Sequence, residues 1–200
     1  MPGLFVTLEG IDRSGKTTQA LLLREALGER AVAVREPGGT AVGERVRELL
    51  KDPAIQVDER TEALLFAAAR AELVSEVIRP ALEEGRIVVS DRFLDSSLAY
   101  QGGARGLGVE EVERVNQFAT GGLRPDVTIL LDLAPAAAAA RAGVEVDRFE
   151  REGAGLQERV RETYEQLVAL DPDRWVRVDA DREADAVHRD VLGVVEGALA

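Results

Sequence analysis

Residues 10–17 read Gly-Ile-Asp-Arg-Ser-Gly-Lys-Thr and match Gly-x-x-x-x-Gly-Lys-[Ser/Thr] at every fixed position. Gly10 and Gly15 permit backbone turns that a Cβ would hinder, so the amides of the loop can form a concave row around phosphate oxygens. Lys16 supplies a compact positive charge toward the β- and γ-phosphates, and the Thr17 hydroxyl is a group that Mg²⁺ accepts as a ligand. The segment therefore predicts binding of a nucleotide polyphosphate.

The residues on both sides of this loop fit the setting that it requires. Leu4–Glu9 is a short apolar run with β-branched residues, which is typical of a buried parallel strand. Residues 16–27 carry apolar side chains at helical spacing and end just before Gly28. Only two of the 25 cationic residues are lysine, at positions 16 and 51. The compact ammonium of lysine suits position 16 of the phosphate loop better than the planar guanidinium of arginine.

Strand-like runs alternate with helical patterns along the whole chain. The expected strands are Leu4–Glu9, Ala31–Arg35, Ile87–Asp91, Val127–Asp132 and Trp175–Asp179. The expected helices cover residues 16–27, 43–50, 60–84 with an interruption near Pro80, 109–120, 135–142, 156–170 and 184–199. This alternation predicts one α/β domain with a five-stranded parallel sheet, helices on both faces, and ligands at the carboxyl ends of the strands.

Composition narrows the classes of protein further. The chain has no cysteine, which excludes disulfides. Its length of 200 residues and its content of 46% hydrophobic and 31% charged residues fit a single globular domain. No apolar run approaches a membrane span, and the N-terminus has no secretion signal, so we expect no membrane partner and a cytoplasmic location. The net charge of −12 argues against nucleic-acid binding and requires a locally positive site for an anionic nucleotide.

Two further groups of residues have types that suit phosphate chemistry and base binding. Asp91 ends an apolar strand, where an acid can organise Mg²⁺, and Arg92 follows with a fork that fits a phosphate; the alternative is an ordinary surface ion pair. Phe66 and Arg70 are four residues apart and share a helix face, where they could stack on a base and bond its edge. A core aromatic beside a solvated arginine remains the alternative.

With these residues in place, the sequence resembles the thymidylate kinase family over essentially its whole length. Residues 9–19 are similar to the opening motif of that family, and residues 35–40 to its Arg-Glu-Pro-Gly-Gly-Thr loop. Phe66-Ala-Ala-Ala-Arg70 resembles its Phe-x-x-x-Arg helix, and residues 91–102 its Asp-Arg-x-x-x-Ser-x-x-Ala-Tyr-Gln-Gly segment. Residues 147–150 look like its lid motif, within a mobile lid expected at about 142–155.

The resemblance implies a P-loop NTPase fold and transfer of the γ-phosphoryl group of ATP to dTMP, with Mg²⁺ as cofactor and a homodimer as the assembly. Phe66 would stack on thymine, Arg70 would bond its edge, Tyr100 would exclude a 2′-hydroxyl, and Arg92 would hold the acceptor phosphate. The full set that it implies for dTMP is Asp12, Glu36, Phe66, Arg70, Arg92, Ser96, Ser97, Tyr100, Gln101 and Asp147.

On the donor side the resemblance implies an ATP site with adenine between Arg141 and residues 179–181. The full set is Gly10, Ile11, Asp12, Arg13, Ser14, Gly15, Lys16, Thr17, Thr18, Arg141, Asp179, Ala180 and Asp181. Thr17 and Asp91 would organise the metal, and the catalytic groups would be Arg13, Lys16, Asp91 and Arg92. The family has members with an arginine in the phosphate loop and members with basic lids; here the loop carries Arg13, which we take as the transition-state arginine.

Other functions remain open at this point. A different small-molecule P-loop kinase would share the loop, but Phe66, Arg70 and Tyr100 favour a pyrimidine deoxynucleotide. A GTPase-type switch would carry an Asn-Lys-x-Asp motif, whereas the single asparagine, Asn116, is followed by Gln117. A binding module without activity would not need Lys16, Thr17 and Asp91 together.

Overall fold

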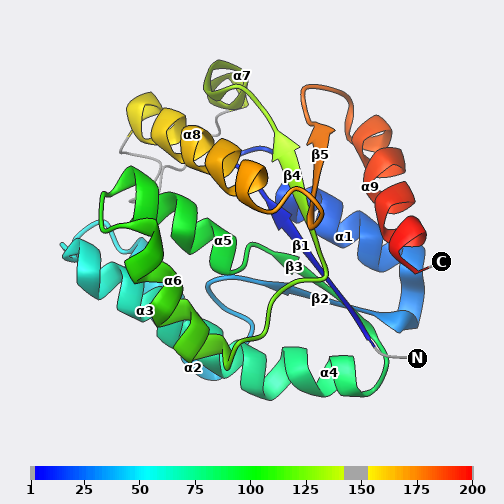
Figure 1. The fold of residues 1–200 in the computed structure, drawn as a ribbon, viewed down its shortest axis with the longest axis horizontal. Coiled ribbons are helices and arrows are strands. Elements are labelled where there is room, and N and C mark those ends of the chain that lie inside the picture. The colour runs from blue at the N-terminus through cyan, green and yellow to red at the C-terminus, as the bar shows by residue number, and fades with distance from the viewer. Residues whose placement is uncertain (1–2, 142–152, 200) are drawn as a thin grey trace.

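The computed structural model describes residues 3–141 and 153–199. Five strands form one parallel sheet in the order β2-β3-β1-β4-β5 (Figure 1). The strands are β1 (Leu4–Glu9), β2 (Ala31–Arg35), β3 (Ile87–Asp91), β4 (Val127–Asp132) and β5 (Trp175–Asp179). Both the fold class and all five strand ranges expected from the sequence are confirmed.

The central strands are apolar because both faces of the sheet are covered. Every residue of β3 is buried, and so are all but the first of β1. β1 lies between β3 and β4, with Leu8 level with Asp91 and with Ile129. Parallel pairing brings the carboxyl ends of the strands to one edge, so the loop after β1 and the residues after β3 meet there.

Helices cover both faces of this sheet. On one face α1 (Lys16–Leu27) packs against α9 (Ala184–Ala198). The other helices lie on the opposite side (Figure 1). They are α2 (Ala41–Lys51), α3 (Glu59–Leu73), α4 (Arg79–Glu83), α5 (Leu94–Ser97), α6 (Val109–Thr120), α7 (Pro135–Ala140) and α8 (Ala154–Leu170). No helix within the described ranges is both long and apolar enough to cross a bilayer.

The helices differ from expectation in several places; α7 ends at residue 140 instead of 142, and α8 begins at residue 154 instead of 156. The long pattern from residue 60 is α3 followed by the π-helical turn η2 (Val74–Ile78) and α4, with Pro80 near the start of α4. α2 begins two residues early, because the Thr40 hydroxyl caps it by accepting from the Gly43 amide at 3.0 Å. No sequence pattern predicted α5 or the π-helical turn η3 (Leu98–Ala104).

The expected lid lies almost entirely outside the described residues, which stop at 141 and resume at 153. Its last two residues belong to the first turn of α8. Asp147, which the resemblance places at the acceptor, lies outside the described residues as well.

Candidate active site

A cavity of about 790 Å³ runs along the carboxyl edge of the sheet. It is lined by the loop after β1 and by residues from α2, α3, α5, η3 and α9. Its cationic lining residues are Arg13, Lys16, Arg35, Arg47, Lys51, Arg70, Arg92, Arg141 and Arg182, and its acidic ones are Asp12, Glu36, Asp91 and Glu183. The cavity is therefore positive within a strongly negative chain, as binding of anionic substrates requires.

The glycine loop has the backbone that the motif predicts. Gly10 and Gly15 adopt φ of 138° and 97°, and a Cβ on Gly10 would lie 2.7 Å from the Leu131 carbonyl oxygen. Arg13 also has a positive φ of 63°, which costs a residue with a side chain roughly 1 kcal/mol or more. That turn of the chain sets the loop amides between β1 and α1, where they can face phosphate oxygens.

Lys16 lies across the mouth of this loop. Its Nζ donates to the carbonyl oxygens of Gly10 and Ile11 at 3.1 and 2.6 Å and to the Ser14 hydroxyl at 3.2 Å. Burial, and then the nearby Arg92 charge, lower the pKa of Lys16 to about 8. A phosphate that reaches Nζ would restore the favourable charge environment that burial removes.

Thr17 and Asp91 meet at the start of α1. The Thr17 hydroxyl donates to Asp91 Oδ2 at 2.5 Å, which joins the phosphate loop to the end of β3. Both groups are hard oxygen donors of the kind that Mg²⁺ prefers. Among the described residues no cluster of three or more metal-binding side chains occurs, so a magnesium ion here would depend on nucleotide phosphates and water for most of its ligands.

Arg92 joins the two ends of the cavity. It has a φ of 72°, and its guanidinium donates to Asp12 Oδ1 at 2.5 Å and to Ser96 Oγ at 3.1 Å. The same guanidinium lies 5.0 Å from the centre of the Tyr100 ring. Gln157 of α8 holds Asp12 from the other side, since its Nε2 donates to Asp12 Oδ2 at 2.7 Å.

A buried carboxylate supports the backbone around Arg92. Glu9, the last residue of β1, is fully buried and accepts hydrogen bonds from the Phe93 amide at 2.7 Å, the Ser96 hydroxyl at 2.5 Å and the Tyr164 hydroxyl at 2.7 Å. Burial, followed by the charge of Asp95, raises the pKa of Glu9 to about 7. Glu9 thus ties the end of β1 to α5 and α8 immediately beside the phosphate loop.

Arg70 is almost entirely buried at the other end of the cavity. Its guanidinium donates to Glu36 Oε2 from Nε at 2.8 Å and from Nη2 at 2.5 Å, to Ser97 Oγ at 3.1 Å, to the Phe93 carbonyl at 3.0 Å, and to Asn116 Oδ1. Burial of Glu36 raises its pKa, against the opposing charge of Arg70. The arginine is held rigidly in the wall, so any bond from it to a base would share or replace these partners.

The expected adenine residues lie together at the opposite end. Arg141 Nη2 donates to the Ala180 carbonyl at 2.7 Å, and Nη1 donates to the Arg13 carbonyl at 3.4 Å. Arg141 also lies 3.8 Å from an oxygen of Asp181. Arg141 and Ala180 line the cavity, whereas Asp179 and Asp181 flank it.

Several cavity residues were absent from the sequence prediction. Arg35 is the last residue of β2, and Arg47 and Lys51 lie four residues apart on α2. Their positions at the carboxyl end of a strand and at helical spacing were the available signals. Gln19 and Pro37 were also missed, although they lie in the motifs at residues 9–19 and 35–40. The other missed residues are Gln157, Arg182, Glu183, Ala184 and Val187, and no motif in the sequence indicates them.

A parallel sheet whose first strand enters a glycine loop with Lys16 and Thr17, opposite an acid at the end of a neighbouring strand, defines a P-loop nucleotide-binding protein. A family model described as thymidylate kinase matches residues 8–191. The chain is 54% identical to thymidylate kinase of Desulforudis audaxviator, over 92% of this chain and 86% of that protein. It is 51% identical to that of Symbiobacterium thermophilum, over 98% and 94%, and 50% identical to that of a Thermoanaerobacter species, over 98% of each. The chain belongs to the thymidylate kinase family.

Proposed function

We propose that this protein transfers the γ-phosphoryl group of ATP to dTMP and releases dTDP and ADP. The observation that carries the proposal is one cavity with a phosphate-binding loop at one end, Phe66 and Arg70 at the other, and the separate cation Arg92 between them, in contact with Asp12 and the Tyr100 ring. Two anionic substrates need two sets of cations, and the cavity supplies both. Family membership agrees with this chemistry.

In this scheme the donor phosphates lie in the loop from Gly10 to Thr18. Lys16 Nζ, released from the loop carbonyls, contacts the β- and γ-phosphates, while Arg141 and residues 179–181 hold the adenine. The acceptor phosphate binds Arg92, which is held by Ser96. Thymine stacks on Phe66 and contacts Arg70, Ser97 and Gln101. Glu36 holds Arg70 in place. Asp12 faces the sugar of the acceptor.

The reaction itself moves one phosphoryl group between two oxygens. An oxygen of the dTMP phosphate forms the new P–O bond as the bond from the γ-phosphorus to the ADP oxygen breaks, and that electron pair stays on ADP. Lys16, Arg13 and Arg92 stabilise the charge spread over the moving group. Because little covalent chemistry is required of the protein, in-line placement by both ends of the cavity is its main contribution.

We further propose Mg²⁺ as the cofactor, next to Thr17 and Asp91. The two oxygens are 2.5 Å apart at the end of the phosphate loop, and this donor set suits a hard divalent ion. When bound, Mg²⁺ supplies charge that neutralises the phosphates of ATP. A cytoplasmic location and the lack of a nucleic-acid partner stay predictions.

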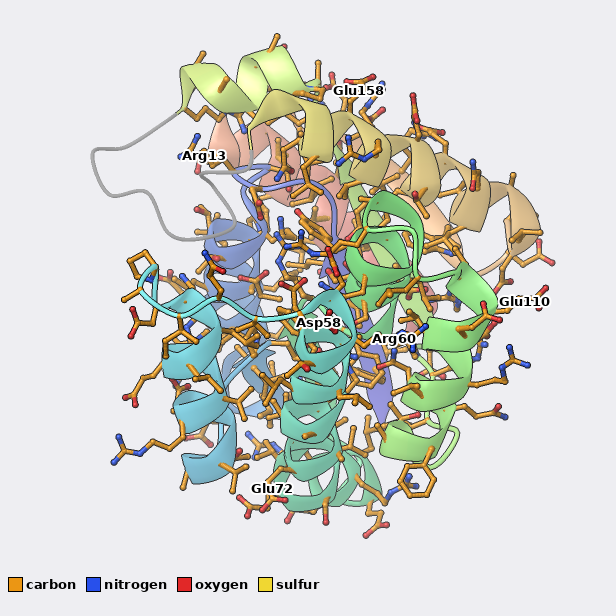
Figure 2. The ribbon with its side chains drawn as sticks, turned by 90° about the vertical axis from the view of Figure 1, so that its left-hand side faces the viewer. Arg13, Asp58, Arg60, Glu72, Glu110 and Glu158 are labelled. Carbon is orange, nitrogen blue, oxygen red and sulfur yellow. The ribbon has the colours of Figure 1, made fainter. Side chains whose placement is uncertain are left out.

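We also propose a homodimer that forms through α2, α3 and α6. Figure 2 shows these three helices side by side on the face turned to the viewer, and α3 packs against both neighbours. Large apolar side chains are exposed on all three, including Val42 and Leu49 on α2, Leu64 on α3 at 58% and Phe118 on α6 at 92%. A second copy of the chain would remove this apolar surface from water.

A coupled assay of ADP release with ATP, Mg²⁺ and a panel of nucleoside monophosphates tests the activity. We expect the highest kcat/KM with dTMP and almost no ADP release when no acceptor is present. Preference for another monophosphate would make the protein a different kinase. Phosphate release without an acceptor would favour a nucleotide switch and contradict the proposal.

A further inference from the structure

Glu62 is a buried acid that lies behind the cavity wall rather than in it. The residue is 1% exposed, on the first turn of α3, and Phe66 and Arg70 follow it at successive four-residue steps of the same helix face. Its Oε1 accepts from Gln101 Nε2 at 2.9 Å and from Arg105 Nε at 2.6 Å, and its Oε2 accepts from Arg105 Nη2 at 3.1 Å. A buried, charge-compensated carboxylate thus contacts a residue that lines the cavity.

The contact determines which end of the Gln101 amide faces Glu62. A side-chain amide has one acceptor oxygen and one donor nitrogen, whereas an ionised carboxylate only accepts. The amide nitrogen must therefore face Glu62, and a flipped amide would place two oxygens against each other with no proton between them. Gln101 Oε1 accepts no hydrogen bond from any described residue, and Gln101 lies in the cavity wall.

We propose that Glu62 is a positioning residue for base selection, because it holds the Gln101 amide with Oε1 available to the base. This inference rests on the proposed function, since it assigns Gln101 to the base end of the dTMP site. Arg70 and Ser97 line the same end, and a guanidinium has only donors to offer. Each Arg70 N–H already has an acceptor within the protein, so a base carbonyl would share or replace one of these partners, next to the acceptor from Gln101.

This order of donor and acceptor fits one class of pyrimidine. Thymine and uracil carry a carbonyl oxygen at C4 next to an N3–H donor, which pair with Arg70 and Gln101 Oε1 respectively. Cytosine carries an amino group at C4 and an unprotonated N3, so both contacts would oppose like groups. Rejection of such an analogue is strong when buried polar groups are left without partners.

The test compares dTMP with dCMP in the wild-type protein and in Glu62→Gln. A glutamine at position 62 can either donate or accept, so the Gln101 amide becomes free to flip. We expect the ratio of kcat/KM for dTMP to that for dCMP to fall at least tenfold, with the KM for ATP within twofold of the wild-type value. Glu62→Asp keeps an acceptor-only carboxylate and should retain more of the ratio than Glu62→Gln.

Two control variants show whether a change in the ratio reflects base selection or a folding defect. Glu111→Gln removes an exposed ion pair with Arg114 on α6 and should leave the ratio unchanged. In a Gln101→Met background, Glu62→Gln should change the ratio no further, because the amide that it orients is gone.

With the wild-type protein alone, dTMP methylated at N3 should lose at least a hundredfold in kcat/KM, since the donor to Gln101 Oε1 is missing.

The outcomes distinguish this inference from the proposed function. An unchanged dTMP/dCMP ratio in Glu62→Gln, or normal use of N3-methyl dTMP by the wild type, overturns the role of Glu62 and leaves the kinase assignment intact. A wild-type protein that does not phosphorylate dTMP overturns both.

Discussion

Arg92 Nη2 lies 2.5 Å from Asp12 Oδ1, so the cation assigned to the acceptor phosphate pairs with an acid of the donor loop. The pair is partly buried, and Arg92 lowers the pKa of Asp12 against the effect of burial. Asp12 also bonds Gln157 of α8. An acceptor phosphate that binds Arg92 must compete with Asp12, which links acceptor binding to the position of the phosphate loop.

Arg92→Lys should weaken dTMP binding selectively. Lysine keeps the charge but loses the fork that reaches Asp12, Ser96 and the Gly10 carbonyl. We expect the KM for dTMP to rise about 30-fold, which corresponds to about 2 kcal/mol for a charge-assisted bond, and the KM for ATP to stay within twofold. Arg161→Lys, which alters a pair with Asp132 outside the cavity, is the matched control. Equal losses for both substrates would contradict the assignment.

Arg13 is expected to act in the transition state rather than in binding. It lies in the loop between β1 and α1 (Figure 2), and Arg13→Ala keeps the Cβ and with it the strain of the positive φ. Arg13→Gly removes the side chain without that strain. We expect both variants to lose at least about 100-fold in kcat at saturating substrates. Near-normal turnover in Arg13→Gly would show that another group supplies this charge.

Lys16 should make ATP binding depend on pH. With a pKa near 8, Lys16 is about one-quarter protonated at pH 8.5, and bound phosphates would raise that pKa. ATP binding at pH 8.5 should therefore take up about three-quarters of a proton, and affinity should fall as the pH rises above 8. Titration calorimetry in two buffers of different ionisation enthalpy measures the uptake. Lys16→Met should abolish it, and equal uptake in that variant would contradict the prediction.

Glu9 should reduce stability as it ionises. Its pKa is raised from 4.5 to about 7 in the folded protein, so the native state holds a proton that the unfolded chain releases between these values. The stabilising effect of that proton is complete below pH 4.5 and is lost as the pH rises through 7, by up to about 3 kcal/mol. Urea unfolding of wild type and Glu9→Gln across pH 4.5 to 8 should show the variant gaining relative stability. A constant difference would show that Glu9 does not titrate in this range.

The dimer should depend on the face formed by α2, α3 and α6. Leu64→Asp places a charge on the exposed apolar surface of α3 and should give a monomer at micromolar concentration. Sedimentation velocity measures the change. Leu170→Asp alters a leucine at the end of α8 that is even more exposed than Leu64 and should leave the dimer intact. A wild-type monomer at that concentration would contradict the proposed assembly.

Local sequence patterns were sufficient to predict the sheet and the phosphate loop. Buried parallel strands need apolar runs, and the loop needs glycine, Lys16 and Thr17 at fixed spacing, so both leave a signal within a few residues. The α5 helix left no such signal, because two of its four residues, Asp95 and Ser96, are held by Arg174 and Glu9 from distant elements. Glycines at 102 and 103 in the following turn further weakened the helical pattern.

The sequence alone determined that this chain is a P-loop protein and indicated its acceptor motifs, because the chemistry of phosphate binding restricts residue types within short segments. Only the tertiary structure decided how those side chains are held. Gln157 reaches Asp12 across 145 positions of the chain, and Glu62 reaches Gln101 across 39. Such contacts depend on how helices pack against the sheet, which no local spacing encodes, and they fix the orientation of the polar groups in and around the cavity.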